Sequence, residues 1–145
     1  MTNQVNEKKT YKQRDNKINT DILHQIPGEQ RIYHSYDKII FVNENGINNY
    51  PVQFLNSLTI SVLPPHKLVL KVNCIGLLIR NLNTKEPLVN GIRMQIKFML
   101  CNAINCKVLT GNVRNKRILI PRINLTYSGT ILSFNLQRTQ YLHLR

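Results

Sequence analysis

The chain has 145 residues, of which 42% are hydrophobic and 19% are charged, and its formal net charge is +13. This length gives room for one domain, or for one small domain with pieces of another, and the composition is that of a globular protein. The sequence holds no run of about 18 apolar residues that could cross a membrane. Residues 1–21 also lack the apolar stretch of a secretory signal, so we expect an intracellular protein.

The first part of the chain is predicted to contain a tail, a helix and an extended segment. Residues 1–15 are polar and mixed in charge, which predicts disorder. Within residues 16–25 isoleucines recur at every fourth position, which predicts a helix, and Pro27 and Gly28 end it. Residues 31–42 are rich in Ile, Tyr, Phe and Val and are predicted to be extended.

A loop and a short helix are predicted next. The composition of residues 43–49 indicates the loop. Pro51 suits the first turn of a helix, in which Phe54 and Leu58 are neighbours four residues apart. The Pro-Pro pair at 64–65 cannot continue that helix.

From Leu68 onward the apolar pattern has a period of two, which predicts strands. Residues 68–72 alternate, with Lys71 on the solvent side. Residues 75–79 are continuously apolar, as in a strand buried on both faces. Residues 92–100 alternate most clearly, with Phe98 on the core side. The remaining predictions are a strand over 104–108, a turn over 111–116, an edge or bulged strand over 117–123 containing Pro121, and a strand over 132–136. Short strands at this spacing favour a small barrel or a bent sheet.

The positive charge is concentrated in the second half of the chain. Residues 1–65 hold seven Lys and Arg against six Asp and Glu, whereas residues 66–145 hold thirteen against Glu86 alone. Such a surface attracts polyanions and releases condensed counterions when it neutralises phosphates. The asymmetry favours contact with nucleic acid, with acidic proteins and anionic membranes as the alternatives.

Motifs for catalysis and metal binding are missing from the sequence. The six glycines form no phosphate loop, and Glu86 has no acidic neighbour that could share a magnesium ion. Independent ATP hydrolysis is therefore not expected. Cys74, Cys101 and Cys106 are an odd number without zinc-ligand spacing, so we expect buried, reduced thiols and no metal site.

Several motifs, in order along the chain, resemble the Pif-type DNA helicases, especially the branch found in Helitron transposons. They are residues 26–29 (IPGE), 54–58 (FLNSL), 63–72 (LPPHKLVLKV), 78–82 (LIRNL), 90–93 (NGIR), 109–111 (LTG) and 118–123 (ILIPRI). Members of this family are ATP-dependent helicases that move 5′ to 3′ on single-stranded DNA. Their second RecA-like motor domain, 2A, carries an inserted small Src-homology-3-like barrel, 2B.

The resemblance implies an α+β chain that is mostly β in its second half. The expected parts are a disordered tail (1–15), a partial RecA-like 2A segment with short helices (16–65), a 2B-like small β-barrel (66–125) and a strand returning toward a truncated motor domain (126–145). The sequence departs from the family in lacking the phosphate loop and in stopping before the nucleotide-sensing motif. We therefore expect no cofactor on this chain, although ATP and magnesium are implied for the complete family enzyme.

Ten residues are candidates for contact with nucleic acid. Two follow the Pro-Pro pair, two end an apolar strand, and six lie on or beside the alternating strands. They are His66, Lys67, Arg80, Asn81, Arg93, Lys97, Lys107, Lys116, Arg117 and Arg122. For any one of them a solvated strand end or turn is the alternative. Tyr127 and Tyr141 are candidates for base stacking, whereas Phe134 fits the core better.

The leading hypothesis is a partial Pif-type helicase whose 2B-like region contacts single-stranded DNA, without an ATPase of its own. We expect a monomer without a membrane partner, working with a motor domain from a separate chain or a missing segment. The nucleus is the favoured location, with the mitochondrion as the alternative, and DNA repair and recombination are the implied processes. Two other hypotheses stay open: a basic small-barrel module that binds acidic proteins, and a non-functional remnant of a transposon helicase.

Overall fold

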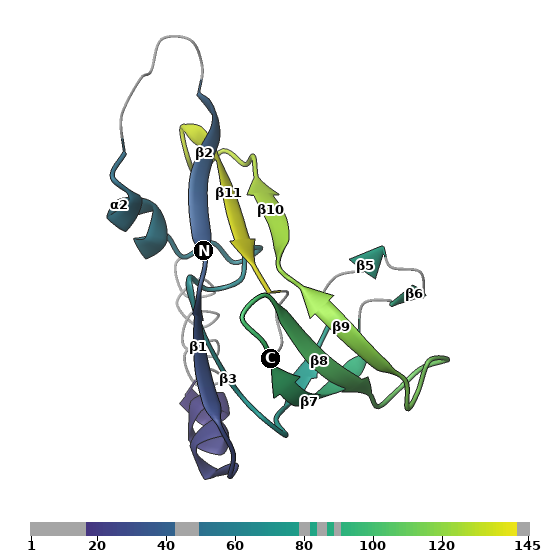
Figure 1. The fold of residues 1–145 in the computed structure, drawn as a ribbon. Coiled ribbons are helices and arrows are strands. Elements are labelled where there is room, and N and C mark those ends of the chain that lie inside the picture. Colours follow the sequence, from purple (N-terminus) through teal and green to yellow (C-terminus); the bar gives the residue numbers. More distant parts are fainter. Residues whose placement is uncertain (1–16, 43–49, 79–81, 84–86, 89–90, 142–145) are drawn as a thin grey trace, which may run out of the picture.

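The computed structural model describes residues 17–42, 50–78, 82–83, 87–88 and 91–141, and strands are the predominant regular structure in this part (Figure 1). After a helical segment over residues 17–25, the elements in chain order are β1 (Gln30–His34), β2 (Tyr36–Val42), α2 (Val52–Ser57), β3 (Lys67–Lys71), β4 (Ile75–Leu77), β5 (Leu82–Asn83), β6 (Pro87–Leu88), β7 (Arg93–Met99), β8 (Ala103–Val108), β9 (Arg117–Pro121), β10 (Ile123–Tyr127) and β11 (Phe134–Gln140).

The strands pair antiparallel in four groups. β1 pairs with β3, β5 pairs with β6, a three-stranded sheet has the order β10-β11-β2, and a four-stranded sheet has the order β4-β7-β8-β9. The chain passes directly from β1 into β2 and from β9 into β10, so these pairs of strands link the groups (Figure 1). Within the described residues the edge strands β4 and β9 do not pair with each other. The mostly-β fold class is thus confirmed, with an open sheet that is compatible with a small barrel.

Two apolar clusters hold these sheets together. The larger lies between the β1–β3 pair and the inner face of the four-stranded sheet, and Met94, Ile96 and Ile104 in it are fully buried. The smaller lies between α2 and the three-stranded sheet, around Leu55 and Leu136. Burying one such side chain stabilises the fold by about 1.5–3 kcal/mol. The larger cluster therefore fixes which face of the four-stranded sheet is left for solvent.

Most of the predicted elements are confirmed. The helix is present over the described residues 17–25, and the extended segment 31–42 is present as β1 and β2. Pro51 caps α2 from just outside its first turn, and Pro121 lies on an edge strand as predicted. The turn over 111–116 is also present. The predicted loop over 43–49 lies outside the described residues.

For two strands the prediction of which side chains are buried was wrong. β4 is an edge strand rather than one buried on both faces, because Ile75 and Leu77 are exposed while Gly76 is buried. In β7 a bulge between Ile96 and Phe98 interrupts the alternation, so Phe98 is exposed and the following methionine is buried.

Lys71 was predicted to face solvent and is instead buried. Its Nζ donates to the backbone oxygens of His24, at 3.4 Å, and Ile26, at 3.2 Å. These carbonyls lie at the C-terminal end of the first helix, where the helix dipole favours a cation. Lys71 therefore fastens this helix to β3.

A buried ion pair connects strands from distant parts of the sequence. On β11, Arg138 donates two hydrogen bonds to Asp37 on β2, from Nε to Oδ1 at 2.8 Å and from Nη2 to Oδ2 at 2.9 Å. The same guanidinium donates to the backbone oxygens of Leu55, Leu58 and Pro64 at 3.1, 3.2 and 3.1 Å. Both charged side chains are at most 1% exposed. The pair therefore ties the segment from α2 to β3 onto the three-stranded sheet.

Replacing this guanidinium is predicted to destabilise the protein strongly. Arg138→Met leaves the Asp37 carboxylate buried without its partner, which costs about 3–5 kcal/mol in similar cases. Chemical denaturation with urea measures this loss in the free energy of unfolding. The matched control is Arg31→Met, which breaks a solvent-exposed pair with Glu29 and should change stability little. Equal effects of the two substitutions would contradict the proposed role of the buried pair.

Candidate nucleic-acid interface

The outer face of the four-stranded sheet carries a row of cations. In the strand register Lys107 of β8 lies opposite Arg117 of β9 on one side and opposite Gln95 of β7 on the other. Arg93 precedes Gln95 by two residues and so faces the same way. The buried residues Met94, Cys106 and Ile120 alternate with these positions on the inner face. Alternation thus fixes these three cations on the side away from the core.

The bulge in β7 adds two side chains to this face. Lys97 is the extra residue between Ile96 and Phe98 and pairs with no residue of β8. At such a bulge one strand has two residues opposite one on its partner, so the normal alternation resumes one residue later. Consequently Phe98 and Lys97 both lie toward the outer face, and Met99 returns to the core.

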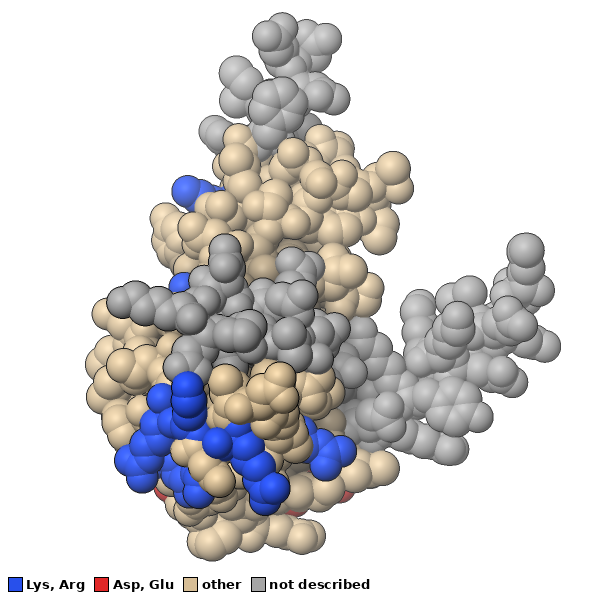
Figure 2. All heavy atoms as spheres, turned by 90° about the vertical axis from the view of Figure 1, so that its right-hand side faces the viewer, with Lys and Arg blue, Asp and Glu red and all other residues tan. Residues whose placement is uncertain are grey.

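Further cations come from the turn between β8 and β9. Arg114 and Lys116 lie in this turn and are exposed. Gly111 and Asn115 have φ angles of 84° and 70°, in the left-handed region that a tight turn of this kind requires. Lys and Arg side chains gather on the lobe made by this sheet, and hardly any acidic side chain is visible there (Figure 2). Residues 87–145 contain no Asp or Glu at all, so β7, β8, β9 and their turns carry only positive formal charges.

The structure brings together five of the ten residues predicted to bind nucleic acid. Arg93, Lys97, Lys107, Lys116 and Arg117 lie on the four-stranded sheet or in its adjoining turn. His66 and Lys67 lie at the start of β3, on the β1–β3 pair. The predicted sites Arg80 and Asn81 lie outside the described residues.

Arg122, the remaining predicted residue, lies between β9 and β10 and makes contacts within the fold. Its Nη1 donates to the backbone oxygen of His34 at 2.6 Å. Its guanidinium also lies over two aromatic rings, 5.6 Å from the centroid of Tyr33 and 5.1 Å from that of Tyr141. These contacts join β1 to the β9–β10 bend, so the cation already has partners within the fold. Tyr141 is fully buried, so its ring is unavailable for base stacking; Phe134 is buried, as predicted.

A Ser–His–Asp cluster beside this region has a structural geometry rather than a catalytic one. Ser35 Oγ donates to Asp37 Oδ1 at 2.9 Å and lies 2.8 Å from His66 Nδ1. A hydroxyl has one proton, so with that proton on Asp37 the imidazole N–H is the donor to Ser35. An activated serine would instead give its proton to the histidine. Partial burial lowers the pKa of His66. The nearby Asp37 carboxylate raises this pKa, but by less than burial lowers it.

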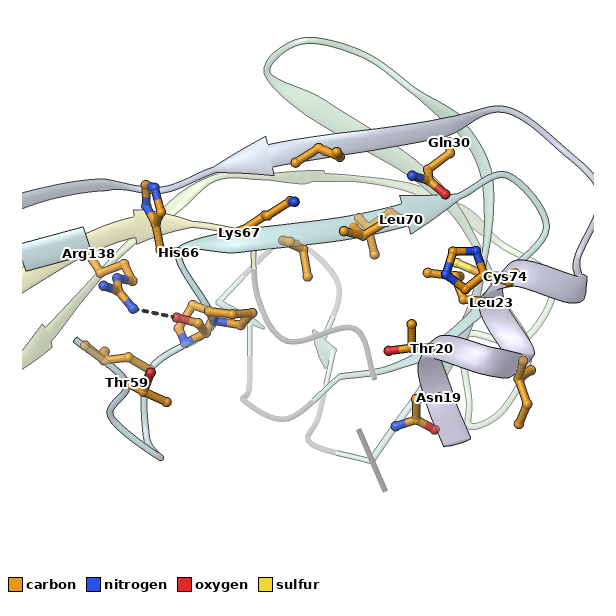
Figure 3. Close-up of a pocket in the computed structure, with 18 of the residues that line it drawn as sticks. Asn19, Thr20, Leu23, Gln30, Thr59, His66, Lys67, Leu70, Cys74 and Arg138 are labelled. Atoms are coloured by element: carbon orange, nitrogen blue, oxygen red, sulfur yellow. Dashed lines mark hydrogen bonds between the residues drawn. The ribbon is translucent and has the colours of Figure 1, made fainter. Parts of the chain in front are cut away.

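A cavity of about 990 Å³ lies between the first helix, β3 and the segment before it (Figure 3). Most of its lining is apolar, with Leu23, Leu68 and Leu70 among the contributing residues. The polar groups of His66 and Arg138 that reach it are held in the contacts described above. The mainly apolar lining is more typical of a surface that packs against another apolar surface than of a catalytic site.

The described residues offer no metal site. They contain no group of three or more His, Cys, Asp or Glu side chains that could hold an ion. All three cysteines are free thiols; Cys74 and Cys106 are buried as predicted, whereas the prediction of burial was wrong for Cys101, which is exposed just beyond β7. Burial raises the pKa of Cys106 to about 12, which keeps it protonated. Among the helices that the structure describes, none has the length and apolar character needed to cross a membrane.

Several residues of the outer face were missed in the sequence. Gln95, Asn105 and Leu119 line it together with the cations, and Arg114 adds to its rim. The alternating pattern places Gln95 and Asn105 on the outside of their strands, but only the register shows that these side chains and Leu119 are neighbours.

Comparison with known proteins connects this fold to one helicase family. The family described as "DNA helicase Pif1, 2B domain" matches residues 53–99. A solved structure of Bacteroides Pif1 bound to single-stranded DNA is 20% identical, with a TM-score of 0.61 over 90% of this chain and 27% of that one. Candida albicans Pif1 is 18% identical, with a TM-score of 0.57 over 87% of this chain and 31% of that one.

A third solved structure, described as two coordinating Pif1 helicases at forked double-stranded DNA, is 23% identical. Its TM-score is 0.59 over 92% of this chain and 26% of that one. No curated protein matches the sequence. This chain therefore spans about a third or less of the length of these three helicases.

The lowered pKa of His66 predicts a stability that falls in mild acid. The folded state favours neutral His66, so its contribution is complete above the unfolded value of about 6.5 and is lost as the pH falls below it. His66→Asn, which keeps an N–H near Ser35, should make the free energy of unfolding fall less between about pH 7.5 and 5.5. Urea denaturation at each pH measures this. His24→Asn, at an exposed position on the first helix, should behave as the unsubstituted protein; an unchanged pH dependence in His66→Asn would refute the assignment.

Proposed function

Because this chain contains a 2B region of the Pif1 helicase family, we propose that it contacts single-stranded DNA through the outer face of its four-stranded sheet. The observation that carries this proposal is the convergence of Arg93, Lys97, Lys107 and Arg117 on that one face. The chain contributes DNA contact and does not hydrolyse ATP by itself.

The face suits a nucleic-acid backbone in charge and in shape. Its cations lie on three adjacent strands, and strands in a sheet are about 4.8 Å apart. Neighbouring phosphates along an extended strand can therefore meet different cations of the face at the same time. Since residues 87–145 contain no acid, a bound backbone meets no opposing charge from this part of the chain.

The similarity to solved helicases supports the class of partner. The Bacteroides relative was solved with single-stranded DNA bound. We extend that partner to this chain because the two proteins share a fold and because this chain has a basic face. The ATP-dependent unwinding that we propose for intact relatives needs a phosphate loop, and these 145 residues contain none. A motor domain outside this sequence would supply it.

The salt dependence of binding tests the proposed contact. If the face engages three to five phosphates, the logarithm of the association constant for a labelled single strand should fall against the logarithm of salt with a slope of roughly −2 to −3.5. The double substitution Lys107→Gln with Arg117→Gln should make this slope shallower by about 1.4. Fluorescence anisotropy over a salt series measures both values.

A matched double substitution on the rest of the molecule serves as the control for this experiment. Lys17→Gln with Lys38→Gln removes the same charge from exposed positions on the first helix and β2. This variant should bind with nearly the original slope. An equal loss in the two double variants would mean that only net charge matters, and undetectable binding at low salt would rule out the DNA contact.

ATP hydrolysis is predicted to be undetectable for the purified chain. The sequence offers neither a glycine-rich loop for the phosphates nor paired acids for magnesium. Phosphate release should stay at the level of a buffer control, with or without single-stranded DNA. Turnover stimulated by DNA would overturn this part of the proposal.

A further inference from the structure

The outer face of the four-stranded sheet also holds a polar atom to which the fold gives no partner. Asn105 lies at the centre of this face, on β8, and is only 9% exposed. Its side-chain Oδ1 is buried and accepts no hydrogen bond from the described part of the chain. An amide oxygen removed from water without a donor carries an uncompensated desolvation cost. A donor from a bound molecule would offset that cost.

The neighbours of this amide are apolar and exposed. In the register Asn105 lies opposite Phe98 of β7 on one side and opposite Leu119 of β9 on the other. Phe98 is 43% exposed and Leu119 is 57% exposed, so both can turn aside without disturbing the core. Side chains that lie directly opposite on adjacent strands have Cβ atoms about 4.5–5.5 Å apart. The three residues therefore form one continuous strip across the sheet, with an aromatic ring at one end and an unpaired acceptor in the middle.

Each strand also places a cation beside this strip. Lys97 precedes Phe98 at the bulge, Lys107 follows Asn105 by two residues, and Arg117 precedes Leu119 by two residues. Two residues along a strand span about 6.7 Å. This separation is of the order of the reach from a nucleobase to the phosphate of its own nucleotide. The cations thus lie where the backbone would pass if a base occupied the strip.

We propose that Phe98, Asn105 and Leu119 form a base subsite, in which one nucleobase stacks on Phe98 and an N–H of its edge donates to Asn105 Oδ1. This inference rests on the proposed contact with single-stranded DNA and adds to it. Without the subsite the face would bind the backbone alone. With it, the face holds an unpaired base as well, and so distinguishes a single strand from a duplex whose bases are stacked and paired.

The chemistry of the strip favours a base over an acidic peptide. A base has a flat π-face for the phenyl ring, and all four DNA bases carry an N–H on the pairing edge, so the subsite accepts any of them. Acidic side chains would satisfy the surrounding lysines and arginines. Their carboxylate oxygens only accept hydrogen bonds, however, so they cannot donate to Asn105 Oδ1, and they offer no aromatic face to Phe98.

Comparing strands with and without bases tests the subsite. The full chain is titrated at low salt into a labelled oligothymidylate of about 12 nucleotides, a length within the range of small DNA-binding barrels. A second titration uses an abasic oligonucleotide with the same sugar-phosphate backbone. We expect the oligothymidylate to bind about tenfold more tightly. Phe98→Ala and Asn105→Leu should each lose most of this preference while keeping affinity for the abasic strand.

Two controls separate loss of the subsite from other effects. Tyr36→Ala removes an exposed aromatic side chain from β2, on a different sheet, and should keep the preference. Asn105→Leu removes the unpaired buried oxygen with little change in size, so its thermal melting temperature should be no lower than that of the original chain. A melt followed by circular dichroism checks that each variant is folded.

The outcomes distinguish the subsite from the phosphate contact on which it rests. Equal, salt-dependent affinity for the two oligonucleotides would overturn the base subsite and leave the phosphate contact in place. An unchanged preference in Asn105→Leu would overturn the role of the amide. Failure to bind either strand would overturn both proposals. In a parallel titration, binding of a labelled polyglutamate peptide that depends on Phe98, without DNA binding, would assign the face to an acidic protein instead.

Discussion

The buried pair between Asp37 and Arg138 is the interaction on which the rest of the fold depends. It joins two adjacent strands of one sheet and, through three carbonyl oxygens, the whole connection from α2 to β3. Gln140, next on the same side of β11, continues this pattern by donating to the backbone oxygens of Tyr33 and His66 at 3.0 and 3.1 Å. β4, the first strand of the four-stranded sheet, follows β3 directly in the chain. The polar contacts that hold the start of β3 therefore also help to position that sheet.

Local patterns in the sequence were sufficient to predict most of the strands. Alternation located β7 and β8, and the Pro-Gly pair located the end of the first helix. The pattern failed where the pairing of strands decides the outcome. A run of apolar residues around Ile75 resembles a strand covered on both faces, yet its edge position leaves it half covered. The burial of Lys71 was equally hidden, because the helix whose carbonyls it contacts lies 45 and more residues away in sequence.

The candidate interface was predictable in composition but not in arrangement. The absence of acids after Glu86 indicated a basic surface, but the sequence left open whether its cations share one face or are scattered around the barrel. Which side chains lie opposite one another depends on the strand register, which a sequence with several short strands does not specify. Arg122 illustrates the limit, since its partners come from β1 and from the residue after β11. For Asn105 the alternation indicated only the outward side of its strand, because the missing partner of its Oδ1 follows from the neighbouring strands and not from the local pattern.

The bulge in β7 has a consequence for how this surface changes during evolution. Lys97 is an extra residue that the strand accommodates without moving Ile96 or Met99 from the core. The loss of its codon would shorten β7 by one residue, remove one positive charge from the outer face, and leave the same side chains inside. A one-residue deletion, which elsewhere in a strand would exchange its two faces, is therefore expected to leave the core unchanged at this point. The charge of the surface can be altered here independently of the core that supports it.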